Sequence, residues 1–154
     1  MEFKDNSAAV LAQLEKNKLK VLNEIGLHWQ RRAVELATDN AVVDTGRYRA
    51  SLSFITPDKE SGRNKSELKP GKDGKPPVSK ASDALSGRSD QDTVTVGSNV
   101  DYAVWIEEGA RKRHKRPVVG NAILYYKDEY EQIAKRTLGE GFEVSAGDVV
   151  TNRR

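Results

Sequence analysis

The sequence contains no cysteine, which excludes disulfide bonds, thiolate metal sites and thiol nucleophiles. It has only two histidines. His28 lies beside the apolar stripe of a predicted helix and His114 lies inside a cationic run, so we predict that neither is a catalytic base or a metal ligand. No stretch approaches the run of about 20 apolar residues that a membrane-spanning helix needs, and the start of the chain lacks the pattern of a signal peptide. We therefore expect a protein without an export signal or a membrane span.

The composition sets limits on size and on charge-driven binding. A chain of 154 residues fits one domain, and 32% charged against 36% hydrophobic residues predicts that a sizeable part of it lies outside the core. The 26 basic and 23 acidic side chains leave a net charge of only +3, which is too balanced to indicate nucleic-acid binding by itself. Local clusters of charge must carry any such argument.

Helical periodicity dominates the first quarter of the chain. Apolar residues recur at steps of three and four between Ser7 and Thr38, which predicts a long amphipathic helix that Asp39 and Asn40 close. A helix of more than 30 residues overhangs a sheet of short strands, so we expect part of its stripe to meet another subunit. The residues of the stripe are Leu11, Leu14, Leu22, Ile25, Trp29, Ala33 and Leu36.

The stretch VDTGRYRASLSF predicts a turn that leads into a first, half-buried strand at 51–55. A second strand is predicted in TVTVGS, 93–98, where valines alternate with threonines. Residues 57–92 between them are rich in Lys, Ser, Gly, Asp and Pro, which is typical of a long mobile arm at the end of a β-hairpin.

The second half of the chain returns to helical periodicity. Asp101 is predicted to cap a short helix that Gly109 ends, and Tyr102, Trp105 and Ile106 share one face of it. After the basic run RKRHKR, Pro117 is predicted to be the first residue of a long helix that continues to Gly139. Its stripe consists of Val119, Ile123, Tyr126, Tyr130 and Ile133, and the tail after it either adds an edge strand near 142–144 or frays.

This order of elements predicts an α+β fold: a small antiparallel sheet packed by a long N-terminal and a long C-terminal helix, with a long flexible hairpin arm. We interpret 1–154 as a single domain whose core comprises about 7–56 and 93–145, with the arm at about 57–92 and a flexible C-terminal tail.

The candidate catalytic groups are few, and each has a plainer explanation. Glu107 and Glu108 are adjacent, so on a helix they diverge by about 100° instead of converging as an acid–base pair, and a solvated helix end explains them. GKDGKPP lacks the spacing of a phosphate-binding loop. The single Asp-Thr-Gly would need a second copy to form an aspartic-protease site. The residues therefore offer no convergent catalytic or metal-binding group, and an enzyme built on Asp-Thr-Gly or on these carboxylates is only the third functional hypothesis.

The basic run at 111–116 is the best candidate for binding a polyanion, because five permanent positive charges in six residues can contact phosphates without sequence specificity. The alternative is that it forms a solvated turn between two helices, or pairs with acidic residues of a neighbour. A small nucleic-acid-binding protein that uses this run therefore remains the second functional hypothesis.

Three stretches in this order resemble the tail-completion or head-tail joining proteins of long-tailed bacteriophages and prophages. They are VDTGRYRASL, then VGSNVDYAVWIEEG after a gap, then RPVVGNA at the start of a long helix. Departures from the family pattern lie at Glu108, at Ala110, in the longer basic link and at 118–121.

The resemblance implies a structural virion protein of the neck or tail end, with no enzymatic activity, no cofactor and no metal, that is made in the bacterial host cytoplasm. It implies a ring, commonly of six copies, formed in advance or from a free monomer, that contacts a head-connector or head-closure protein and a tail-tube or tail-terminator protein. If the ring encloses a channel, Arg111, Lys112, Arg113 and Lys115 would make non-specific DNA contacts. Subunit-interface or structural roles are expected for Asp44, Thr45, Gly46, Arg47, Arg49, Tyr102, Trp105, Glu107, Gly109, Arg116 and Pro117.

Overall fold

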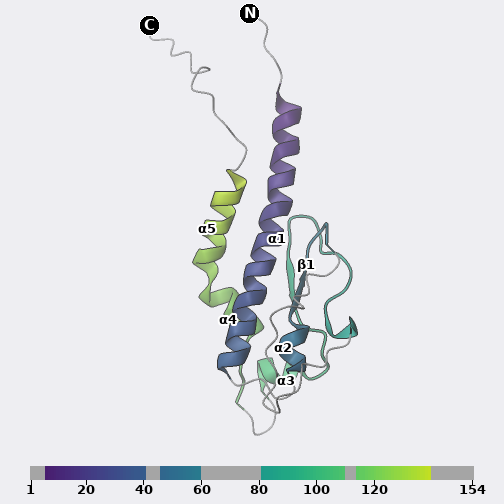
Figure 1. The fold of residues 1–154 in the computed structure, drawn as a ribbon, viewed down its shortest axis with the longest axis vertical. Coiled ribbons are helices and arrows are strands. Elements are labelled where there is room, and N and C mark those ends of the chain that lie inside the picture. Colours follow the sequence, from purple (N-terminus) through teal and green to yellow (C-terminus); the bar gives the residue numbers. More distant parts are fainter. Residues whose placement is uncertain (1–5, 41–45, 60–80, 110–113, 140–154) are drawn as a thin grey trace, which may run out of the picture.

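A computed structural model describes residues 6–40, 46–59, 81–109 and 114–139. One long helix, α1 (Ser7–Asp39), forms the axis of the molecule. Two C-terminal helices lie along one side of it, and the sheet lies on its other side (Figure 1). The α+β class predicted from the sequence is confirmed. The other elements are α2 (Arg47–Ser51), β1 (Ser53–Ile55), the short 3-10 helix η1 (Ala81–Asp83), β2 (Thr95–Gly97), α3 (Ala103–Glu108), α4 (Val119–Tyr125) and α5 (Lys127–Leu138).

The sheet consists of β1 and β2, which pair antiparallel with Phe54 opposite Val96. Both strands are shorter than predicted, with three residues each. Residue 51 still belongs to α2, so the predicted strand began two residues too early. The prediction that β1 is half-buried is wrong, because every residue of this strand is buried. One face packs on α1, and the segment that follows η1 covers the other: the Leu85 amide donates to Ser53 Oγ at 2.8 Å.

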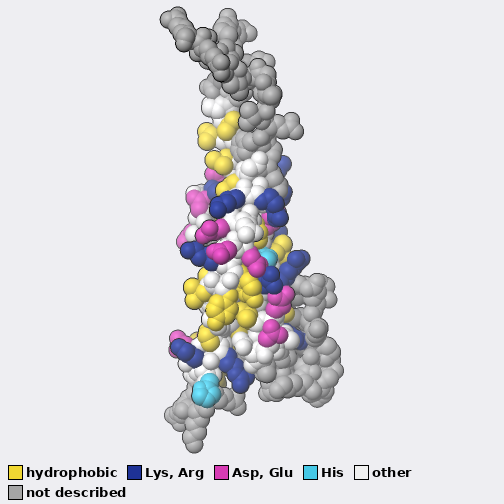
Figure 2. Space-filling view, turned by 90° about the vertical axis from the view of Figure 1, so that its left-hand side faces the viewer, with side chains coloured by type: hydrophobic (Ala, Val, Ile, Leu, Met, Phe, Trp, Pro, Cys, Tyr) yellow, Lys and Arg dark blue, Asp and Glu magenta, His cyan; other side chains and the backbone are white. Residues whose placement is uncertain are grey.

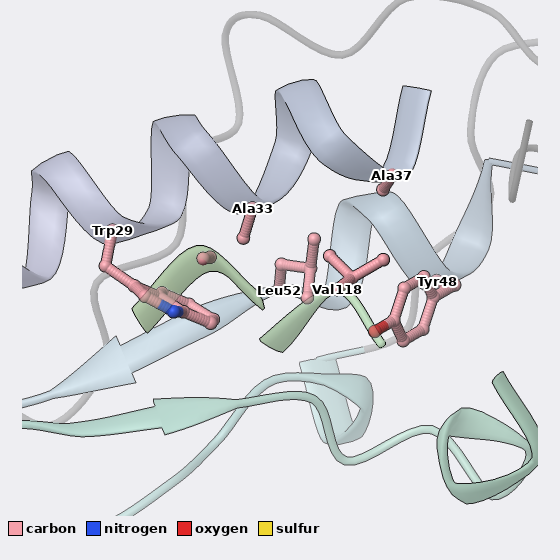
Figure 3. Close-up of a cluster of buried hydrophobic side chains, with 7 residues drawn as sticks. Trp29, Ala33, Ala37, Tyr48, Leu52 and Val118 are labelled. Atoms are coloured by element: carbon pink, nitrogen blue, oxygen red, sulfur yellow. The ribbon is translucent and has the colours of Figure 1, made fainter. Parts of the chain in front are cut away.

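The core lies where α1, α2 and α4 meet (Figure 3). Small residues on α1 allow this close approach, since Ala33 and Ala37 are fully buried and leave room for Leu52 and Val118. The indole of Trp29 points into the same cluster, and its Nε1 donates to the Val119 carbonyl at 3.4 Å. These contacts attach the C-terminal helices to the first helix.

The N-terminal part of α1 extends beyond both the sheet and α5 (Figure 1). The buried residues of α1 begin at Asn17, whereas Leu11 and Leu14 in the predicted stripe are 61% and 44% exposed. The predicted overhang is therefore confirmed. Its apolar residues Val10, Leu11 and Leu14 are all exposed.

The sequence predicts one long C-terminal helix, whereas the structure has two. Tyr126, at φ −111° and ψ 19°, breaks it into α4 and α5. Pro117 is not the first helical residue, because α4 begins at Val119. The predicted stripe is also shifted within α4: Ala122 is buried while Ile123 is 45% exposed. Because the chain changes direction at residue 126, the apolar faces of α4 and α5 do not follow one continuous period of 3.6 residues.

The predicted arm is too long at its C-terminal end. Asp83 and Ala84 are buried, and the Asn99 amide donates to the Asp83 carbonyl at 2.9 Å, so residues near η1 pack against the body of the fold. At the other end, Thr56 and Lys59 close a turn through their backbones. The central part of the arm, 60–80, and the tail, 140–154, lie outside the described residues.

Candidate functional site

The Glu107 carboxylate joins three segments that are far apart in the sequence. Its Oε1 accepts a hydrogen bond from the Tyr48 hydroxyl at 2.7 Å. The same oxygen accepts from the backbone amides of Val118 and Val119, both at 2.9 Å. We call this arrangement of Glu107, Tyr48, Val118 and Val119 the Glu107 corner. It connects α2, α3 and α4 through one side chain.

The interpretation of Glu107 as a solvated helix end is wrong. The first amides of a helix have no partner inside it and carry partial positive charge, so a carboxylate at the start of α4 is stabilising. Tyr48 is buried, and its pKa is raised by that burial and also by the hydrogen bond to Glu107. The hydroxyl therefore stays a donor. Glu108, its neighbour, is exposed as predicted.

Arg47 forms a paired contact with a carboxylate that the sequence did not single out. Its Nε and Nη2 donate to the two carboxylate oxygens of Asp83 at 2.9 and 2.7 Å. The Asp83 hydrogen bond is the main reason why the pKa of Arg47 is raised. This contact gives Arg47 a structural role, which was one of the two roles expected for it. Asp83 was missed because it lies in the segment that we assigned to the arm.

Arg49 points inward and is only 3% exposed, so within this chain it is not available at the surface as an interface residue. Its Nη1 donates to Thr38 Oγ1 at 3.3 Å, next to the end of α1. Burial lowers the pKa of this guanidinium. Gly46 precedes α2 with φ 73°, a conformation that other residues resist, as the turn prediction required. Asp44 and Thr45 lie outside the described residues.

The residues predicted on α3 separate into half-buried and exposed positions. Gly109 ends the helix with φ 85°, and its amide donates to the Trp105 carbonyl at 3.1 Å, as expected for a helix stop. Asp101 does not cap α3, because the N-cap position is Tyr102 and no side chain caps it. Tyr102 is half-buried, whereas Trp105 is 64% exposed, so the two do not share one buried face.

Arg116 holds the segment before α4 in place. Its backbone amide donates to the Ile106 carbonyl at 2.8 Å, and its Nη1 donates to the Asn40 carbonyl at 3.0 Å, where α1 ends. Pro117 follows and is half-buried. Lys115 is exposed, in agreement with a solvated basic turn, while Arg111, Lys112 and Arg113 lie outside the described residues.

A second polar cluster, which the sequence analysis did not predict, attaches α5 to α1. The Glu129 carboxylate accepts from Arg32 Nη2 at 3.0 Å and also contacts His28 Nε2. The His28 ring meets Tyr130 edge-on with centroids 5.7 Å apart, and the Arg32 guanidinium lies 4.6 Å from the ring centre of Tyr126. Burial, followed by the Glu129 charge, raises the pKa of Tyr130 to about 12.

Acid should weaken this cluster. The pKa of Glu129 lies below its usual value because Arg32, and then His28, donate hydrogen bonds to the carboxylate. A lowered folded-state pKa contributes stability that is present above the unfolded-state value of about 4.3 and is lost as the pH falls below it. We therefore expect Glu129→Gln to flatten the acid branch of the stability curve. Chemical denaturation from pH 7 to pH 3 would measure this, with exposed Glu108→Gln as control; equal slopes for Glu129→Gln and wild type would contradict it.

Comparisons of the chain with known proteins find no match. No family model matches the chain, and no curated protein or solved structure matches it either. Within the described ranges, no three His, Cys, Asp or Glu side chains gather as a metal site would require. A search of the described helices also finds none with the length and apolar character of a membrane span.

Proposed function

We propose that the chain is a structural virion protein of a bacteriophage or prophage that forms a ring at the head–tail junction or at the tail end. The observation that carries the proposal is the Glu107 corner. It brings together the three stretches on which the resemblance rests, since Tyr48 belongs to the first, Glu107 to the second and Val118–Val119 to the third.

The corner also accounts for a departure from the family pattern. Residues 118–121 differ from the family's third motif, but Glu107 contacts only the backbone amides of Val118 and Val119. A contact to backbone tolerates a change of side chain, provided that the chain still starts a helix there. The departure at the third motif is therefore compatible with membership of the family.

Exposed apolar residues give further support to an assembly role. Val104 and Trp105 on α3 are 57% and 64% exposed, next to the corner at Glu107. Large exposed aromatic side chains are common anchors of protein interfaces. The overhang of α1 supplies a second exposed apolar area. A ring-forming subunit needs more than one such surface, because each copy contacts two neighbours and the proteins above and below it.

The first test is the solution mass of the full chain. Light scattering with and without a candidate tail-tube or connector protein, followed by negative-stain imaging, should show rings alone or rings that form on the partner. A chain that ignores these partners but binds DNA with strong salt dependence, and loses that binding when Lys115 and its basic neighbours are neutralised, would favour the nucleic-acid-binding hypothesis.

Trp105 provides a residue-level test of the same proposal. We expect Trp105→Ser to leave the fold intact, because the side chain is largely exposed, and to weaken ring or partner assembly by roughly tenfold or more. Leu27→Ser is the matched control, since Leu27 is also an exposed apolar residue but lies on α1 away from the corner. Unchanged assembly of the Trp105 variant, measured by sedimentation velocity, would remove α3 from the proposed interface.

A further inference from the structure

The outer face of α5 carries opposite charges at its two ends. Glu129, Tyr130 and Thr137 face α1 or are buried, so at 100° per residue Asp128 and Lys135 lie on the opposite side of the helix. Both are exposed, and neither has an ion-pair partner among the residues that the structure describes. An acidic side chain near the start of a helix and a basic one near its end both interact favourably with the helix dipole. They also make this face complementary to itself when two such helices run antiparallel.

Exposed apolar residues lie beyond both ends of this charged face. At the end of α5, Leu138 is 37% exposed, and its carbonyl accepts from Asn17 Nδ2 at 3.1 Å, one turn from exposed Leu14 on α1. Before its start, Leu124 and Tyr125 of α4 are 71% and 66% exposed. Figure 2 shows this side of the molecule, with hydrophobic side chains over α1 above and around α4 below, and a band of mixed charge between them.

We infer that this face binds a second copy of the chain, with the two α5 helices antiparallel across a two-fold axis. In such an isologous contact each residue pair occurs twice. An axis midway between residues 131 and 132 places Asp128 opposite Lys135 of the partner subunit, and Lys135 opposite the partner's Asp128. These two ion pairs define the register of the helices.

The same register brings the apolar ends together. Leu138 lies about 10 Å from the axis at a rise of 1.5 Å per residue, and on the other side of the axis α5 begins at Lys127, just after the break at Tyr126. The two-fold operation therefore brings the end of α5, where Leu138 and Leu14 are exposed, to the start of the partner's α5, next to the end of α4 that carries the partner's Leu124 and the partner's Tyr125. Removing these side chains from water would supply most of the binding free energy, while the ion pairs give orientation.

This contact goes beyond the proposed virion function and does not depend on it. It uses the outer side of α4 and α5, whereas the assembly residue tested above, Trp105, lies on α3. The two ideas can therefore fail separately. Rings that are insensitive to charge changes on α5 would support the virion role alone, and two-fold pairs that never form rings would support this contact alone.

Charge exchange tests the pairing in the full chain by sedimentation equilibrium. The wild-type chain should pair, and both Asp128→Lys and Lys135→Glu should weaken self-association by roughly tenfold, because two attractions become two repulsions. Mixing these two variants should restore pairing between unlike chains. The double variant Asp128→Lys/Lys135→Glu should also regain association, since its face is again self-complementary. Lys16→Glu, an exposed charge change on α1, is the control and should not alter it.

The double variant separates pairing from a purely structural role. If the charges act only on the dipole of α5, exchanging both should be worse than exchanging either, and helix content and thermal stability should fall in parallel. That result would overturn the inference. A wild-type chain that stays monomeric at its highest workable concentration would overturn it too, as would association that Leu124→Ser and both charge reversals leave unchanged.

Discussion

Replacing Glu107 with alanine is expected to lower the free energy of unfolding by about 3 kcal/mol, because it leaves a buried hydroxyl and two helix-start amides without their acceptor. The side chain receives hydrogen bonds from Tyr48, Val118 and Val119 on one oxygen. Losing it should loosen α4 from α2 and α3 together. Urea denaturation followed by tryptophan fluorescence would measure the change.

Two variants show whether the loss comes from the corner. Glu108→Ala removes an adjacent exposed carboxylate and should stay within about 0.5 kcal/mol of wild type. Tyr48→Phe should cost clearly less in the Glu107→Ala background than alone, because the shared hydrogen bond has already gone. A Glu107→Ala variant as stable as Glu108→Ala would show that the carboxylate does not hold the three segments.

Gly26→Ala is expected to destabilise the protein by about 2 kcal/mol or more, although alanine favours helices elsewhere. A Cβ at this position would lie 2.2 Å from Phe54 Cδ2 and 2.6 Å from Cε2. Phe54 is only 1% exposed and sits between α1 and the sheet, so its ring has little space to move. The added methyl must push β1 away from α1. Thermal and urea denaturation would both report the loss.

Gly120→Ala is the matched control for this effect. Gly120 also lies in a helix, but no described atom outside its own helix backbone and its chain neighbours comes within 4 Å of the position of its Cβ, so alanine should be neutral or stabilise by up to about 1 kcal/mol. Shrinking the opposing side chain is a second check. Phe54→Ala should cost about 3–5 kcal/mol alone and distinctly less when combined with Gly26→Ala, because the clash then disappears. Equal effects of alanine at Gly26 and Gly120 would contradict the close contact.

Elements with strong local signals were predicted well. The length of α1 and its overhang follow from residue spacing, but only Trp29 and Ala33 of the predicted stripe are buried. The end of α3 follows from Gly109. The hairpin of β1 and β2 was predicted in the correct order, with strands two or three residues too long. These features depend on periodicity and on glycine conformation, which act between residues close together in the chain.

The candidate site was predicted only in part. Arg47 was singled out, but its partner Asp83 lies 36 residues away and was assigned to the arm. Glu107 was named as a motif residue and yet interpreted as solvated, since Tyr48 lies 59 positions before it. A signal was available for Gly26, because a glycine in the middle of a helical pattern often has a packing reason. It does not identify Phe54 as the neighbour.

The sequence by itself determined the fold class and the long helix that extends beyond the sheet. Only the tertiary structure decided that Glu107 holds α4, that Arg49 points inward and that Tyr126 divides the last helix. Periodicity records which face of an element is apolar. It does not record which distant element covers that face. The hydrogen-bond partners of a polar side chain depend on which element packs there.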